Sequence, residues 1–182
     1  MHLLHEAMLD KQVASLIEKG KGHFFDKVPV LESLTIKMPG TKDLWEHSKS
    51  VCGSVRSNPV LRWAALFHDI GKPVVFETNR SDIGGTFPNH AMIGADIWLD
   101  NCRRFSRILT ADQIKSVERL VRYHMQVLSY SPKWNDKALQ RLVDRFEGDI
   151  ELGIELAEAD GGDLGVLYNL RQRIKRGGAN EQ

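Results

Sequence analysis

The stretch from Val60 to Ile70 constrains the fold more than any other part of the sequence. It follows Asn58 and Pro59, a typical helix cap and first-turn proline. Its apolar side chains cover most of a helical circumference; they include Leu61, Ala64, Ala65, Leu66 and Phe67. A helix of this kind is stable only where other elements surround it. The sequence therefore predicts a buried central helix.

Apolar residues recur at helical spacing along most of the remaining chain, which shows no internal repeat and no long linker. Helices are expected at about residues 3–19, 41–56, 60–70, 88–105, 110–124, 136–146, 149–159 and 163–175. Val74 to Phe76 and the pair Gly84–Gly85 favour instead a loop or one short β-hairpin around residues 74–87. We predict an all-α, single-domain helical bundle. Its expected parts are an N-terminal helix and loop at 1–40, a main domain at 41–176 and a flexible tail at 177–182.

Composition narrows the functional classes. The 182 residues are 42% hydrophobic, and 25 Lys and Arg are balanced by 24 Asp and Glu. A mixed surface of this kind argues against strong nucleic-acid binding. Residues 1–20 carry too many charges for a signal peptide or a membrane span, and two cysteines make a poor disulfide framework. We therefore expect a cytoplasmic protein without membrane partners.

Histidine and aspartate side chains spread over several predicted helices form a candidate metal site. They are His47, His68, Asp69, His90, His124 and Asp160. Imidazole nitrogen and carboxylate oxygen together suit Mn, Fe, Co, Ni or Zn. His68 and Asp69 end the buried helix, where polar groups without partners are costly. Gly71, in a left-handed cap, and Pro73 are expected to end that helix, so that both neighbours can face one cation.

Each of these residues also has a simpler interpretation. His47 fits a hydrogen-bonded core histidine, and Asp160, before Gly161, fits a turn residue. His90 fits a helix start, and His124 fits a helix C-terminus, where a cation offsets the helix dipole. Their joint occurrence favours a metal.

The set His47, His68–Asp69 and Asp160, with HDIGKP after an apolar helix, resembles the HD superfamily of metal-dependent phosphohydrolases. The resemblance covers roughly residues 41–170. It is greatest to the HD domain in the C-terminal part of bacterial tRNA nucleotidyltransferases, in the segments DLWEHS, LRWAALFHDIGKP, FPNHAMIGA and AEADGGDL. A nucleotidyltransferase head is absent, so CCA addition is not expected.

The resemblance implies that His47, His68, Asp69 and Asp160 bind one metal. It also implies that His90 and His124 resemble the additional histidines of members with a second metal, for which Asp69 would be the bridge. Magnesium would suit an oxygen-rich second position. The expected substrate is a nucleotide or a small phosphorylated metabolite, which is hydrolysed at phosphorus.

Several other residues have expected roles in this chemistry. Lys72 would stabilise the developing charge, Asp69 would position the attacking water, and His90 or His124, if free of metal, would protonate the leaving group. Further phosphate contacts are expected from arginines, namely Arg122, Arg104 and Arg107, and also Arg103 or Arg119. The loop at residues 74–89 is the candidate lid.

Two other functions fit the same residues. The first is a di-iron oxygenase, since some HD-superfamily members hold two irons on such a set and oxidise substrates with O₂. The second is a non-catalytic module that binds a nucleotide or a metal without turnover. Neither the pattern nor the composition fixes the oligomeric state.

Overall fold

Helices make up every regular element in the described part of the chain, which comprises residues 1–38, 41–78 and 87–178 of the computed structural model. The N-terminal half contains α1 (His2–Ala7), α2 (Val13–Lys19), α3 (Lys21–Lys27), the 3-10 helix η1 (Pro29–Thr35), α4 (Leu44–Ser54), α5 (Pro59–Phe67) and α6 (Lys72–Thr78). The C-terminal half contains α7 (His90–Asn101), η2 (Cys102–Phe105), α8 (Ala111–Leu128), α9 (Asp136–Phe146), α10 (Ile150–Ala159) and α11 (Leu164–Gly178). The predicted all-α class and single domain are confirmed.

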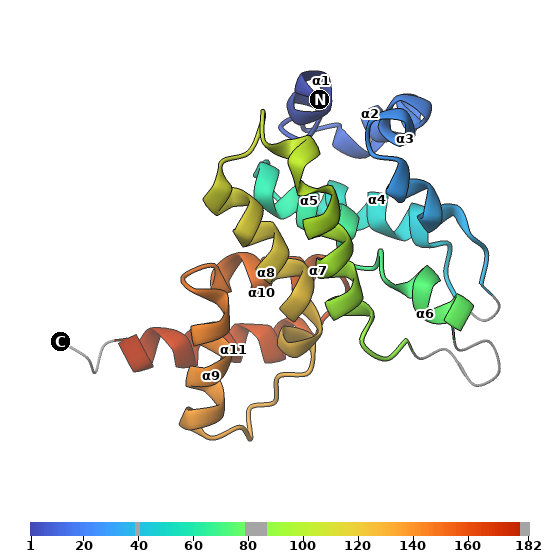
Figure 1. The fold of residues 1–182 in the computed structure, drawn as a ribbon. Coiled ribbons are helices and arrows are strands. Elements are labelled where there is room, and N and C mark those ends of the chain that lie inside the picture. The colour runs from blue at the N-terminus through green and yellow to red at the C-terminus, as the bar shows by residue number, and fades with distance from the viewer. Residues whose placement is uncertain (39–40, 79–86, 179–182) are drawn as a thin grey trace.

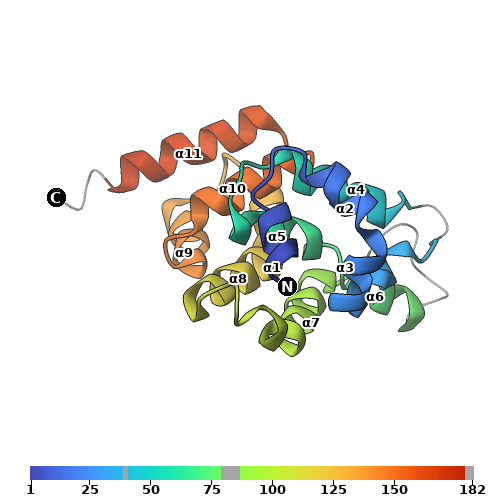
Figure 2. The ribbon, with the colours of Figure 1, turned by 90° about the horizontal axis from the view of Figure 1, so that it is seen from above.

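Helix α5 lies at the centre of the bundle, with α4, α7, α8 and α10 packed around it (Figures 1 and 2). Its N-terminus begins as predicted: the Asn58 side chain accepts a hydrogen bond from the Leu61 amide at 3.1 Å, and Pro59 takes the first position. Trp63 and Phe67 are fully buried and pack edge-on against Phe105. The apolar stretch that dominates the sequence therefore forms the core helix.

The prediction of a hairpin is wrong for residues 74–78, which belong to helix α6. The Val74–Phe76 run has a strand-like composition, but Pro73 lies in the first turn of a new helix, where its missing amide hydrogen costs nothing. The remainder of the predicted hairpin, including Gly84 and Gly85, lies outside the described residues.

The expected helix at residues 3–19 is divided in two. The Asp10 carboxylate accepts a hydrogen bond from the Gln12 amide at 2.7 Å, which stabilises a turn between α1 and α2. Gly20 does not open a long loop, because α3 follows it directly. A local turn thus interrupts the helix that the spacing of the apolar residues predicts.

The N-terminal helices are fastened to the core helix by a buried guanidinium. Arg62 on α5 is 3% exposed and donates to the carbonyl oxygens of Met8 at 2.5 Å and Asp10 at 2.6 Å.

At the other end of the chain, α11 continues to Gly178, and the last four residues lie outside the described part.

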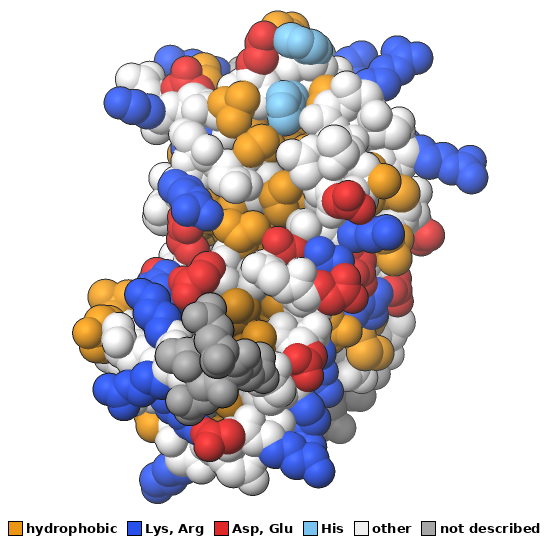
Figure 3. All heavy atoms as spheres, turned by 90° about the vertical axis from the view of Figure 1, so that its left-hand side faces the viewer, with side chains coloured by type: hydrophobic (Ala, Val, Ile, Leu, Met, Phe, Trp, Pro, Cys, Tyr) orange, Lys and Arg blue, Asp and Glu red, His pale blue; other side chains and the backbone are white. Residues whose placement is uncertain are grey.

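The surface carries both signs of charge. Figure 3 shows acidic and basic side chains interspersed over one face of the molecule. Across the described residues, every helix is too short or too polar to span a bilayer.

The two cysteines differ in environment, and we expect them to differ in reactivity. Cys52 on α4 is fully buried, and burial raises the pKa of its thiol to about 12, whereas Cys102 is partly exposed. Since the thiolate is the reactive form, Ellman's reagent at about pH 8 should titrate one thiol in the folded protein and both after unfolding. Rapid reaction of both thiols in the native protein would contradict the buried position of Cys52.

Candidate metal centre

Five separate places in the bundle supply the six His and Asp side chains that the sequence singles out. His47 lies on α4 and His124 on α8, while His90 is the first residue of α7. His68 and Asp69 lie in the turn after α5, and Asp160 follows the last residue of α10. The structure brings all six together.

The first group of ligand atoms contains two imidazoles and two carboxylates. His47 Nε2 lies 2.9 Å from Asp160 Oδ1 and 3.8 Å from Asp69 Oδ2. His68 Nε2 lies 3.3 Å from His47 Nε2, 3.3 Å from Asp69 Oδ2 and 3.4 Å from Asp160 Oδ1. His47, His68 and Asp69 offer atoms that lie within 4.8 Å of one another, close enough to hold one metal ion.

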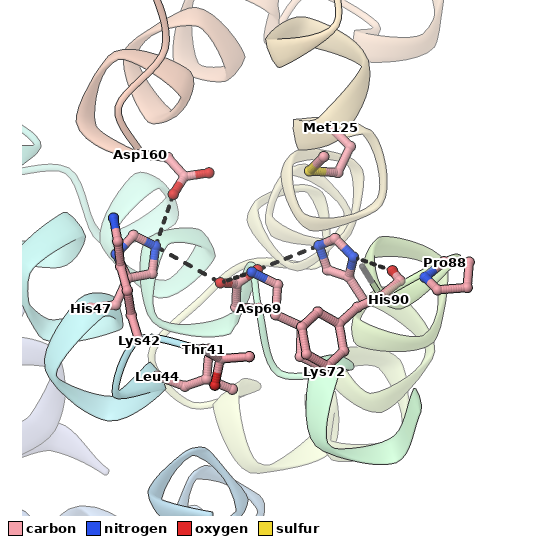
Figure 4. Close-up of a pocket in the computed structure, with 11 residues that line it drawn as sticks. Thr41, Lys42, Leu44, His47, Asp69, Lys72, Pro88, His90, Met125 and Asp160 are labelled. Atoms are coloured by element: carbon pink, nitrogen blue, oxygen red, sulfur yellow. Dashed lines mark hydrogen bonds and ion pairs between the residues drawn. The ribbon is translucent and has the colours of Figure 1, made fainter. Parts of the chain in front are cut away.

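A second group adjoins the first through Asp69. His90 Nε2 lies 3.2 Å from His124 Nε2 and 3.4 Å from Asp69 Oδ1. Asp69 therefore directs one carboxylate oxygen to each group, and Figure 4 shows it between His47 and His90. Asp69, His90 and His124 also satisfy the 4.8 Å distance for a shared ion.

The orientation of three of the rings is set by their own backbone. Nδ1 of His68, His90 and His124 each lies 2.7 Å from a carbonyl oxygen three residues earlier, which is that of Ala65, Phe87 and Val121 respectively. A carbonyl can only accept, so each Nδ1 carries the hydrogen. In the neutral form of each ring, the Nε2 atom presents a lone pair to the cluster.

These facing lone pairs provide a test of whether a cation fits. In their neutral forms, His90 and His124 point two lone pairs at each other across 3.2 Å, and neither has a hydrogen to share. A cation beside Asp69 would turn this repulsion into coordination by both rings. The donor set is therefore suited to a divalent metal.

A tight turn explains how the adjacent residues His68 and Asp69 both face the centre. Helix α5 ends at Phe67, and the amide of Ile70 donates to the Phe67 carbonyl at 3.1 Å. Gly71 is not in the left-handed conformation, so that prediction is wrong. Its role is steric: a Cβ atom there would lie 2.1 Å from the backbone oxygen of His90. Glycine lets this turn approach α7.

Charges within the cluster shift its pKa values strongly. Burial alone would lower the pKa of His68, but the carboxylates of Asp69 and Asp160 raise it to about 10. Burial alone would raise the pKa of Asp69, yet His68 and Lys72 hold that pKa well below its ordinary value. His124 behaves differently: burial and the His68 charge lower its pKa to about 3. The carboxylates are thus ionised and His124 is neutral at physiological pH.

An open cavity of about 640 Å³ leads to the centre. Its lining includes His47, Asp69, His90 and Asp160, together with Thr41, Lys42, Leu44, Lys72, Phe87, Pro88 and Met125. The Lys72 ammonium donates to Asp69 Oδ2 at 2.6 Å. Figure 4 shows Met125 on one side of this row of ligands and Thr41 and Leu44 on the other.

Some of these lining residues are absent from the sequence-based site. The helix expected from about residue 41 begins at Leu44, with Asp43 as its cap, and the Thr41 hydroxyl donates to the Met38 carbonyl. Lys42 and Met125 belong to no recognisable sequence motif. The one feature of the sequence that could have pointed to Met125 as a cavity residue is its position directly after His124. Of the candidate lid, Phe87 and Pro88 line the cavity, while residues 79–86 lie outside the described part.

The structure places the arginines away from this cavity. Arg122 pairs with Glu118 and, at 2.8 Å, with Asp96; Arg119 pairs with Asp149 at 2.8 Å. Arg103, Arg104 and Arg107 line a different pocket. The predicted phosphate contacts by Arg122, Arg104 and Arg107 thus find no support in this geometry, because the fold pairs the first with carboxylates and directs the others elsewhere.

A helical bundle in which several helices share one cluster of His and Asp side chains is typical of a metal-binding domain. The family model described as HD domain matches residues 44–149, more than half of the chain, and the chain therefore belongs to the HD-domain family. The matched segment contains five of the six ligand candidates. Asp160 lies beyond it, and is joined to the centre by its contact with His47. No curated protein matches the chain.

Proposed function

We propose that this protein is a metal-dependent phosphohydrolase acting on a nucleotide or a small phosphorylated metabolite. The observation that carries the proposal is the carboxylate of Asp69, whose two oxygens face two groups of imidazole nitrogens at the floor of an open cavity. Membership of the HD-domain family supports the class of reaction.

His47, His68, Asp69 and Asp160 would hold one cation, and His90 and His124 would hold a second, with Asp69 shared between the two. The mixture of nitrogen and oxygen donors suits Mn, Fe, Co, Ni or Zn. A divalent cation bound there would polarise a phosphate oxygen and lower the pKa of a water molecule.

The surrounding side chains have roles of their own. Lys72 and Lys42 bring two positive charges to the cavity and would neutralise a phosphate dianion. Asp69, which is ionised, would orient the attacking water. Leu44, Phe87 and Met125 give the cavity apolar walls that would hold the organic part of the substrate.

Of the two histidines considered as proton donors, His124 does not suit the role. It is 1% exposed, and its pKa near 3 keeps it neutral. A neutral ring whose Nδ1 hydrogen is already bonded to the Val121 carbonyl has no proton for a leaving group. His124 fits a metal ligand.

The proposal is tested by measuring phosphate release from a panel of nucleotides and small phosphate esters. The full chain would be loaded in turn with Mn²⁺, Co²⁺, Ni²⁺, Fe²⁺, Zn²⁺ and Mg²⁺, with a chelated sample as control. We expect metal-dependent phosphate release. The same six ligands would serve a di-iron oxygenase, so substrate-dependent oxygen uptake by the iron form, without phosphate release, would overturn the proposal. Ligand binding without any product would favour a non-catalytic module.

Metal binding should release a proton from the metal-free protein. The pKa of His68 is raised to about 10, so its ring is protonated between about pH 7 and 9, while coordination needs the lone pair. The apparent metal affinity should therefore rise with pH and level off as the pH passes about 10. Calorimetric titration with Mn²⁺ at about pH 7.5, in two buffers of different ionisation enthalpy, measures this release. Identical heats in both buffers would contradict it.

A further inference from the structure

A second pocket lies between the chain segment that leaves α7 and the end of α3. It has a volume of about 440 Å³ and is lined by Met1, Asp26, Lys27, Arg103, Arg104 and Arg107. None of these residues lines the cavity at the metal centre. In Figure 1 the N-terminal helices lie above the upper end of α7, and the metal centre is at the other end of that helix, at its first residue His90.

The charges around this pocket are unbalanced. Its lining contains four basic residues and one acidic residue, Asp26, and the Arg104 guanidinium donates to the Lys27 carbonyl at 3.5 Å. Within the described part of the chain, none of the four has a carboxylate oxygen within 4.0 Å, whereas Arg119, Arg122 and Arg171 are each paired with two acidic residues. Positive charges that lie close together without counter-ions repel one another, and an anionic ligand would reduce this repulsion.

The walls that carry these charges are firmly anchored. Phe105, between the arginines, is fully buried, with its ring 4.7 Å from Trp63 and 4.5 Å from Trp98 between centroids. On the other wall Val28, next to Lys27, is fully buried, and its amide donates to the Phe24 carbonyl at 2.8 Å. Fixed backbones reduce the entropy lost when a ligand is bound.

We propose that this pocket binds a compact polyphosphate group, of the kind present in pyrophosphate, triphosphate or a nucleoside triphosphate. Guanidinium groups form paired hydrogen bonds to phosphate oxygens, and Lys27 adds a point charge. The cations gather around a concavity. A short, highly charged anion fits this arrangement better than an extended nucleic-acid backbone.

The test is calorimetric titration of the full chain with inorganic triphosphate. Every sample carries Asp69→Asn, which removes hydrolysis and metal chelation, and the arginine variants are compared with this parent, so that any binding at Lys42 and Lys72 in the first cavity is common to all samples. The double variant Arg103→Gln/Arg107→Gln should weaken binding at least about tenfold, or about 1.4 kcal/mol. The matched control is Arg141→Gln, an exposed arginine on α9 that should leave the affinity unchanged. Because all three substituted arginines are exposed, the melting temperatures should stay the same.

Three outcomes would overturn the inference. The double variant could bind triphosphate as tightly as its parent, or Arg141→Gln could weaken binding equally, which would indicate diffuse attraction. A single-stranded oligonucleotide could bind more tightly than triphosphate with the same dependence on Arg103 and Arg107, which would indicate a nucleic-acid surface. The proposed hydrolase activity is measured separately in the metal-loaded protein with an intact Asp69, where the arginine substitutions should have no effect on basal turnover.

Discussion

Replacing Asp69 by Asn should abolish metal-dependent phosphate release and lower the metal content of the purified protein. The substitution keeps the size of the side chain but removes the negative charge that both groups of imidazoles share. Loss of a contact that merely supports a metal ligand costs about 10 to 100-fold in affinity or activity. Loss of the shared ligand itself should cost at least about 100-fold in kcat/KM.

Asp100→Asn is the matched control for this experiment. Asp100 is an exposed carboxylate on α7, the helix that begins with His90, so the same chemical change is made away from the centre. It should retain full turnover and full metal content. Equal turnover by the wild type and Asp69→Asn would remove the proposed mechanism, and a similar loss in Asp100→Asn would show that the effect is not specific to the centre.

Replacing Gly71 by Ala should destabilise the protein by more than about 3 kcal/mol, beyond the usual range for overpacking. The added Cβ would lie 2.1 Å from the carbonyl oxygen of His90 and 2.8 Å from the amide nitrogen of Gly94. Both atoms belong to the backbone of α7, so no flexible side chain can move aside. The turn that carries His68 and Asp69 must then separate from α7.

Gly22→Ala provides the comparison. Gly22 lies in helix α3, and a Cβ atom there would meet nothing within 4 Å, so the change should raise stability slightly, by up to about 1 kcal/mol. Urea-induced unfolding monitored by circular dichroism measures both variants. If Gly71→Ala were as stable as the wild type, the contact between the turn and α7 would be shown to relax without cost.

The sequence is most informative where local pattern and burial coincide. The apolar helix before His68 is predicted as a core helix, and the all-α class follows from the helical spacing of apolar residues along most of the remaining chain. Asp160, over a hundred positions from His47, is singled out by its joint occurrence with the histidines and by the resemblance to the HD superfamily, although by itself it also fits a turn residue. The contact of 2.9 Å between His47 and Asp160 agrees with that reasoning.

The features of the site that could not be predicted from the sequence depend on tertiary contacts. The pattern around Gly71 predicts a left-handed cap, whereas its role is close approach to a helix that lies about 20 residues further along the chain. Arg104 and Arg107 follow the helix that carries His90, but their direction depends on how Phe105 is anchored in the core. Lys42 and Met125 also line the cavity at the metal centre only because of how the helices pack.

The backbone bonds that orient His68, His90 and His124 have a consequence for how such a centre changes during evolution. Each ring is hydrogen-bonded to a carbonyl of its own chain segment, so a displacement of that segment would carry the ring with it. A mutation in the core that tilts α7 or α8 would move a whole ring with it. Preference among cations would then drift through small helix displacements, with every ligand residue left unchanged.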